Sequence, residues 1–149
     1  MRGRFVTMLA AGLLVAACAS DTLYMPASGP GEVGYTESRT DPARFVVTYR
    51  GPSDMKPSDV YQYALLRAAE VTRHSGYGWF YIVDTQGRAL PATGGDVVPS
   101  GPYGDYHRYY DESRHVVSLD IVMGYGHKPP KDPNAFDARR LQKDLDYLK

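Results

Sequence analysis

The alternation of hydrophobic and polar positions first becomes regular between residues 34 and 51. Asp41 and Pro42 predict a turn within this stretch, because proline fixes the φ angle that the first central position of a turn requires. The segment after the turn, residues 44–50, alternates as a half-buried strand does, with three apolar side chains on one face: Phe45, Val47 and Tyr49. We therefore expect a β-hairpin here.

The next stretch, residues 57–75, has the spacing of an amphipathic helix. Pro57 suits the first turn, and Gly76 suits the position at which the chain leaves a helix. One stripe at helical spacing carries the side chains that we expect to face the core: Val60, Ala64, Ala68 and Val71, with Tyr61 and Leu65 beside them. Leu66 lies nearly opposite this stripe, so we expect another part of the chain to cover it; the alternatives are a single exposed leucine or cover by a partner protein.

Two further strands are predicted downstream. Residues 79–84 (WFYIVD) are apolar at nearly every position, which is typical of a central strand buried on both faces. Residues 116–123 alternate, and four side chains point to the core: Val117, Leu119, Ile121 and Met123. The intervening residues 85–113 are rich in glycine, proline and tyrosine, so we expect a long loop with at most one short strand.

The C-terminal residues predict a second helix. Asn134 is a suitable N-cap, and a narrow apolar stripe follows it: Ala138, Leu141, Leu145 and Leu148. This stripe needs only a narrow partner, so we expect it to cover Leu66. The resulting order, β-β-α-β-β-α, predicts a small α+β domain with a mostly antiparallel sheet and two helices packed against it.

The N-terminal residues have the pattern of a signal peptide. Arg2 and Arg4 precede an apolar run, residues 5–17, that is shorter than the ~20 residues a membrane-spanning helix needs. The run ends in VAAC, whose Cys18 is the only cysteine of the chain. VAAC resembles the lipobox of bacterial lipoproteins, which implies cleavage before Cys18 and a lipid on its thiol. The alternative, a free buried cysteine, does not explain a position at a signal-peptide boundary.

This pattern predicts three regions and a location. Residues 1–17 form the signal peptide, residues 18–33 the lipidated cysteine with a flexible tether, and residues 34–149 a single α+β domain. In lipoproteins an Asp directly after the cysteine favours the inner membrane, whereas this chain has Ala19. We therefore expect a protein of the cell envelope that is anchored in the outer membrane and faces the periplasm. The covalent lipid on Cys18, including an acyl chain such as palmitate, is the only cofactor expected.

Composition and charge narrow the choice of partner. Lys plus Arg and Asp plus Glu each number 17, and the resulting zero net charge argues against nucleic acid, which is normally bound by a basic surface. Tyrosine is abundant, with 13 residues, and it provides large contact area in binding loops. Four tyrosines crowd one loop: Tyr103, Tyr106, Tyr109 and Tyr110. They are candidates for binding an envelope protein or a cell-wall glycan; alternatively, they cover an open face of the sheet.

The candidates for catalysis are sparse. Four histidines lack the close spacing of a zinc motif: His74, His107, His115 and His127. His107, Asp105 and Asp111 lie in one loop and could meet a cation, but a solvated polar loop is the favoured interpretation. Asp111 and Glu112 could form a carboxylate pair, but adjacent acidic residues in a loop are usually exposed. We predict no catalytic residue and no metal site, and hence a non-catalytic interaction or structural module. The alternative is a hydrolytic or metal-dependent envelope enzyme that uses the loop at residues 103–115.

Several blocks of the chain resemble one family. The most specific block is YALLRAAEVT, at residues 63–72, and the others are GYTE, RFVVTYRG, GYGWFYIVD and NAFDAR. Together they are similar to a family of small bacterial lipoproteins of uncharacterised function. The resemblance implies the lipid anchor and a domain that spans most of the mature chain. It implies no activity and no site residue.

Overall fold

The fold is known from a computed structural model that describes residues 22–83, 110–111, 113–132 and 135–149. Its elements are β1 (Gly34–Asp41), β2 (Arg44–Arg50), α1 (Pro57–His74), β3 (Trp79–Ile82), β4 (Tyr110–Asp111), β5 (Val116–Gly124), β6 (Ala135–Asp137), α2 (Ala138–Asp144) and the 3-10 turn η1 (Asp146–Leu148). The predicted α+β class and the order β-β-α-β-β-α are confirmed. The short strands β4 and β6 add to this order.

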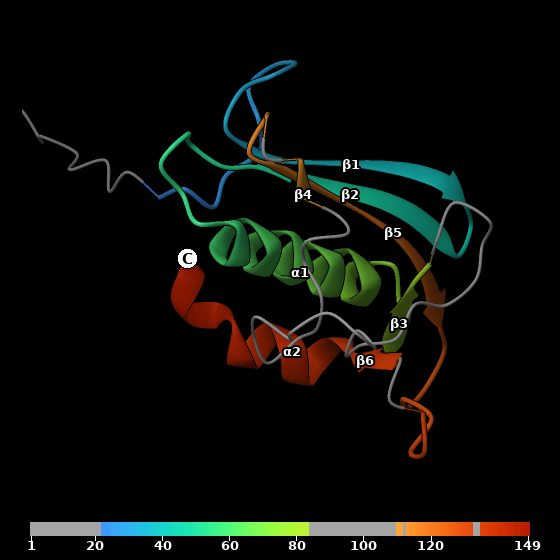
Figure 1. Cartoon of the computed structure of the whole chain (residues 1–149). Helices are drawn as coiled ribbons and strands as arrows, with labels where there is room; N and C mark the ends of the chain where they lie inside the picture. The colour runs from blue at the N-terminus through green and yellow to red at the C-terminus, as the bar shows by residue number, and fades with distance from the viewer. Residues whose placement is uncertain (1–21, 84–109, 112, 133–134) are drawn as a thin grey trace, which may run out of the picture.

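The strands form one antiparallel sheet in the order β1-β2-β5-β3-β6, with β4 also paired to β5. β2 pairs with β5 along its whole length, from Arg44 opposite Val122 to Arg50 opposite Val116. Figure 1 shows α1 between this sheet and α2, and α2 runs back along α1 towards the end where α1 begins. α1 therefore has two apolar sides, one against the sheet and one against α2.

The core side chains are those that the periodicity predicts. Val47 and Tyr49 of β2, every second residue of β5 from Val117 to Met123 and the predicted stripe of α1 are buried. Phe45, predicted on the same face of β2, is only half-buried. The buried members are Val47, Tyr49, Val60, Ala64, Ala68, Val71, Val117, Leu119, Ile121 and Met123. The alternation on the sheet and the helical spacing on α1 thus point to the same interface.

The prediction that β3 is buried on both faces is wrong. Phe80 and Ile82 are buried, whereas Trp79 and Tyr81 are half-exposed on the other face. The reason is that α1 covers one face of the sheet only. The ring of Trp79 lies against Gly124 on the neighbouring strand, and a Cβ at Gly124 would lie 2.1 Å from that ring. A strand with apolar side chains on both faces therefore does not need a second packing layer. An aromatic ring such as that of Trp79 can instead pack on the neighbouring strand and shield the strand pair from solvent.

The second helix begins later than predicted. Asn134 lies outside the described residues, and the N-cap is Asp137, whose side chain accepts a hydrogen bond from the backbone N–H of Arg140 at 2.8 Å. The three residues before the helix instead form β6, which pairs with β3. Leu141 and Leu145 are buried as the stripe predicts.

Leu66 is completely buried, with 0% exposure. Two hydrogen bonds place α2 and η1 over its side of α1, because Arg73 bonds Gln142 and Tyr147 bonds Gln62. Both α1 residues lie on the same helical stripe as Leu66. The prediction that the C-terminal part of the chain covers Leu66 is confirmed.

The predicted flexible tether needs a correction, because the domain begins before Gly34. Pro26 forms a parallel bridge with Tyr35, and Tyr35 is held by backbone hydrogen bonds to Met25 at 2.8 Å and from Ala27 at 2.9 Å. These bonds occupy the free edge of β1, where an unpaired strand would otherwise expose its backbone. Gly34 has a φ of 129°, and a Cβ there would lie 2.6 Å from the carbonyl oxygen of Met25.

Candidate functional site

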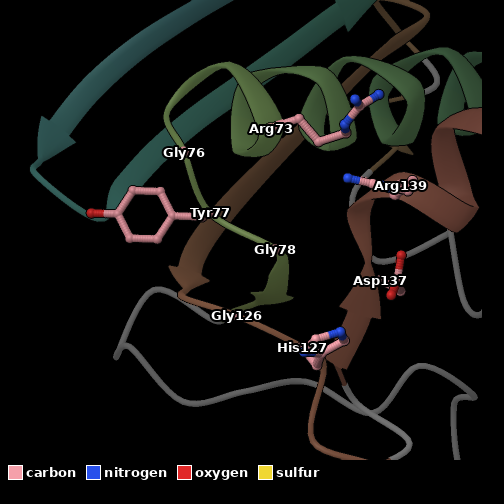
Figure 2. A pocket seen from close by; sticks show the side chains of 8 residues that line it. All are labelled: Arg73, Gly76, Tyr77, Gly78, Gly126, His127, Asp137 and Arg139. Carbon is pink, nitrogen blue, oxygen red and sulfur yellow. The ribbon is translucent and has the colours of Figure 1, made fainter.

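A surface cleft opens where α1 ends and α2 begins. Its volume is about 520 Å³, and its walls come from the end of α1, the turn after β5 and the junction of β6 with α2. The lining residues are Arg73, Gly76, Tyr77, Gly78, Gly126, His127, Asp137 and Arg139. Figure 2 shows that the side chains of Arg73 and Arg139 lie on the same side of the hollow, with His127 at the opposite end from Arg73. The cleft thus gathers ionisable groups from three distant segments.

Two Gly-Tyr-Gly segments, residues 76–78 and 124–126, shape one wall of the cleft. Their tyrosine rings stack with centroids 4.3 Å apart, and the N–H of Gly78 donates to the carbonyl of Gly124 at 2.9 Å. A Cβ at Gly78 would lie 1.6 Å from the carbonyl oxygen of Gly126. Only glycine permits this approach, so the wall is backbone and does not depend on side-chain rotamers.

The charged groups of the cleft differ in how much they are already engaged. Arg73 donates one hydrogen bond to the side chain of Gln142, which leaves its other guanidinium N–H groups available. Arg139 is exposed, and its side chain bonds no other residue in the described part of the chain. Asp137 is engaged as the N-cap of α2, through Arg140 N. Guanidinium groups bind carboxylate or phosphate through paired hydrogen bonds, so this cleft suits an anionic group.

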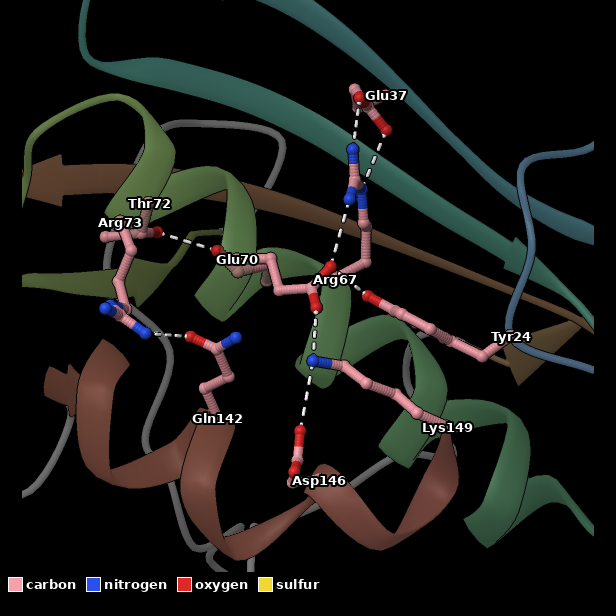
Figure 3. A network of polar contacts seen from close by, with 10 residues as sticks. Tyr24, Glu37, Arg67, Glu70, Thr72, Arg73, Gln142, Asp146 and Lys149 are labelled. Carbon is pink, nitrogen blue, oxygen red and sulfur yellow. Dashed lines mark hydrogen bonds and ion pairs between the residues drawn. The ribbon is translucent and has the colours of Figure 1, made fainter. Parts of the chain in front are cut away.

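A second polar cluster has a structural role, as Figure 3 shows. Glu70 on α1 is almost fully buried, and its carboxylate accepts hydrogen bonds from Tyr24, from Arg67 at 3.0 Å and from Lys149 at 3.0 Å. Arg67 also binds Glu37 of β1 through two hydrogen bonds of 2.6 and 3.0 Å. This cluster joins the segment before β1, the sheet edge, α1 and the C-terminal residue. It closes the fold and leaves Glu70 no free oxygen for chemistry.

The environment of Glu70 predicts a pH dependence of stability. Burial alone would raise the pKa of Glu70, but the hydrogen bonds from Tyr24, Lys149 and Arg67 outweigh burial and lower it. The stabilisation is therefore complete above the unfolded-state pKa of glutamate, about 4.3, and is lost as the pH falls through the lower folded-state pKa. We expect Glu70→Gln to cost about 2 kcal/mol at neutral pH, because charge-assisted hydrogen bonds are lost, and to flatten this acid dependence.

Urea unfolding between neutral pH and about pH 3 measures both effects. Glu32→Gln is the matched control, since it neutralises an exposed glutamate of the same N-terminal region. It should retain the wild-type acid dependence. An unchanged dependence in Glu70→Gln would contradict the role given to this carboxylate.

Most of the site residues predicted from the sequence lie outside the described residues, namely Cys18, Tyr103, Tyr106 and Tyr109. Tyr110 is in the two-residue strand β4, beside Val117. Asp105, His107 and Glu112 also lie outside the described residues. The described part of the chain holds no group of three Cys, His, Asp or Glu side chains arranged for a metal ion. His127 alone lines the cleft. No helix within the described ranges has both the length and the apolar character needed to cross a membrane.

Sequence reasoning missed Arg73 and Arg139 as site residues. Both are exposed arginines on helices, which ordinarily indicates a solvated surface. The signal that could have found the site is the repeated Gly-Tyr-Gly segment, because two such segments at the ends of neighbouring strands favour close contact of backbones. Asp137 could also have been recognised as the N-cap, since aspartate is a preferred N-cap residue and it directly precedes Ala138, the first residue of the apolar stripe.

The comparisons with known proteins add no relative. Neither the protein-family models, nor the curated proteins, nor the solved structures yield a match to this chain. The resemblance to a family of small bacterial lipoproteins accordingly stays a prediction from the quoted sequence blocks. Functional inference therefore has to start from the cleft and from the N-terminal sequence.

Proposed function

We propose that this chain is a lipid-anchored, non-catalytic binding module of the bacterial cell envelope, held in the outer membrane through Cys18 and facing the periplasm. The signal-peptide pattern and VAAC support the anchor. The observation that carries the binding function is the cleft into which α1 and α2 each contribute an arginine, Arg73 and Arg139. The module takes an anionic group there, a carboxylate or a phosphate.

The lining of the cleft favours binding over hydrolysis. Among its described lining residues there is no serine, threonine or cysteine that could act as a nucleophile. Its one carboxylate, that of Asp137, is already bonded to the backbone of α2. The two guanidinium groups and the adjacent glycine backbone instead offer several hydrogen-bond donors to one ligand.

The peptides of the cell wall are a source of carboxylates close to a lipid-anchored domain, and they differ from the glycan partner predicted from the tyrosines. Phosphate groups of other envelope molecules share the same chemistry. The four tyrosines of the 103–110 loop remain proposed as a second contact to an envelope protein or to the glycan itself. The two parts of this proposal are separable, because one is electrostatic and the other depends on aromatic stacking.

The binding role predicts that Arg73→Gln/Arg139→Gln weakens cosedimentation with purified cell-wall sacculi. We expect a loss of at least about tenfold in affinity, because hydrogen bonds to charged groups contribute ~1.5–3 kcal/mol each. Lys56→Gln/Arg114→Gln removes the same charge from exposed positions away from the cleft and should bind as the wild type does. Competition by inorganic phosphate, but not by free wall peptides, would assign the ligand to the phosphate class.

Wild-type binding by the double arginine variant would show that the cleft is not the site. Loss of binding by both double variants would show that overall charge, rather than the cleft, determines the interaction. A far-ultraviolet circular dichroism spectrum identical to that of the wild type confirms that each variant is folded.

A further inference from the structure

The segment that enters the domain presents an apolar edge. Tyr24 points inward, where its ring packs against Tyr35 and Tyr63 and its hydroxyl donates to Glu70. The residues on either side of Tyr24 are not buried with it. Leu23 is 37% exposed and Met25 is 40% exposed. The contacts that hold Tyr24 thus keep two large apolar side chains in solvent.

The covalent distance from the predicted anchor to this edge is short. Cys18 and Thr22 are four residues apart, and a fully extended chain covers at most about 3.5 Å per residue, so their separation cannot exceed about 14 Å. A lipid on Cys18 lies in the bilayer. Leu23 follows directly after Thr22, so it is confined to the vicinity of the lipid surface.

The exposed apolar residues are unevenly distributed over the molecule. In the described ranges, four large hydrophobic side chains are exposed: Leu23, Met25, Tyr125 and Tyr147. Tyr147 lies in the C-terminal turn, which Figure 1 shows at the same end of the molecule as the segment before β1 and the start of α1. Tyr125 lies beside Tyr77, beyond the opposite end of α1.

We propose that Leu23 and Met25 form a membrane-contact edge, which inserts into the interface of the bilayer that holds the lipid on Cys18. This inference rests on the proposed lipid anchor. The occupant is the lipid surface, because the chain that links Cys18 to the edge is too short to carry the domain away from it. Tyr147, at the same end, is of the residue type that favours the membrane–water interface.

The edge sets the orientation of the domain. α1 starts near the membrane end and has 18 residues, so with a rise of 1.5 Å per residue it extends for about 27 Å. The cleft lies at the far end of this helix, beside Arg73 and Gly76. The module therefore stands on its apolar edge and presents the cleft away from the lipid, towards the cell wall.

The single substitutions Met25→Cys and Tyr125→Cys test this orientation in the full lipidated protein. The thiol of Cys18 carries the lipid, so each introduced cysteine is the only free thiol and accepts one environment-sensitive fluorophore. Each labelled protein is reconstituted in vesicles of phosphatidylethanolamine and phosphatidylglycerol, with or without doxyl-labelled lipid. Interfacial segments reach ~5–10 Å into the headgroup region, so we expect at least about threefold stronger quenching at Met25 than at Tyr125.

Flotation of the same vesicles distinguishes a failure of the membrane-contact edge from a failure of the lipid anchor. Flotation together with strong quenching at Met25 alone supports the membrane-contact edge. Equal quenching at both positions in floating vesicles overturns the edge and leaves the anchor intact. A label at Met25 that is shielded from aqueous iodide but unquenched by doxyl lipid also overturns it, since protein then covers the edge. Protein that does not float overturns the anchor and the edge together.

Discussion

Cys18→Ser is expected to abolish both the incorporation of labelled palmitate and the removal of residues 1–17. The serine hydroxyl is a far weaker nucleophile than a thiolate at neutral pH, so no lipid is attached there. The effect should be all or none, because the chain has no second cysteine. Two acyl signals give stable anchoring at ~0.8 kcal/mol per buried methylene, which exposed side chains such as Leu23 cannot replace.

Ser20→Ala is the matched control for this experiment. It changes a hydroxyl two residues after Cys18 and leaves the VAAC sequence intact. It should incorporate palmitate and lose residues 1–17 as the wild type does. Palmitate incorporation in Cys18→Ser at the wild-type level would show that the lipid is attached to another residue and that Cys18 is not required.

The largest loss of stability is expected from Leu66→Ala. Leu66 of α1 is completely buried on the side of the helix that faces the C-terminal elements, in one cluster with Leu141 and Leu145. Truncation removes buried methyl groups and leaves a cavity, which costs about 2–5 kcal/mol for leucine in a packed core. Urea unfolding of the lipid-free form that begins at Ala19 measures this difference directly.

Leu23→Ala is the control for Leu66→Ala, because Leu23 is a leucine with 37% exposure. In the lipid-free form it should lower the free energy of unfolding by much less than Leu66→Ala. Equal effects of the two substitutions would contradict the packing of the C-terminal elements over Leu66. That packing also implies that truncation before Ala138 should expose Leu66 and destabilise the domain.

The regular parts of the fold could be predicted because their periodicity is strong. The alternation of β2 and β5 and the stripe on α1 identified the core, and the stray position of Leu66 identified a second contact of the helix. Strand β6 could not be predicted in the same way. It has three residues, too few for any period to show, and its place in the sheet depends on pairing with β3.

The segment before β1 shows a different limit of prediction from sequence. Its glycine, proline and serine content indicates a flexible tether, yet it is fixed by one aromatic side chain and two backbone hydrogen bonds. Tyr24 finds partners from β1 and α1 that are brought together only in the folded domain. Local composition cannot report such contacts, because they depend on tertiary structure.

The cleft was beyond prediction for a related reason. Arg73 and Arg139 are far apart in sequence, and each alone has the pattern of an ordinary surface residue. They line one hollow because the antiparallel packing of α2 on α1 brings the end of one helix to the start of the other. The proposed anchor, in contrast, rests on a pattern of consecutive residues, so it can be predicted from the sequence alone.

The lipid anchor is the central claim, and the intact mass of the protein extracted from membranes tests it most directly. The mass of a chain that begins at Cys18 and carries a diacylglyceryl group, with or without a further acyl chain on its α-amino group, is the predicted result. Fragmentation should place all of the added mass on Cys18. An unmodified cysteine, or a mature chain that begins at any other residue, would contradict the account.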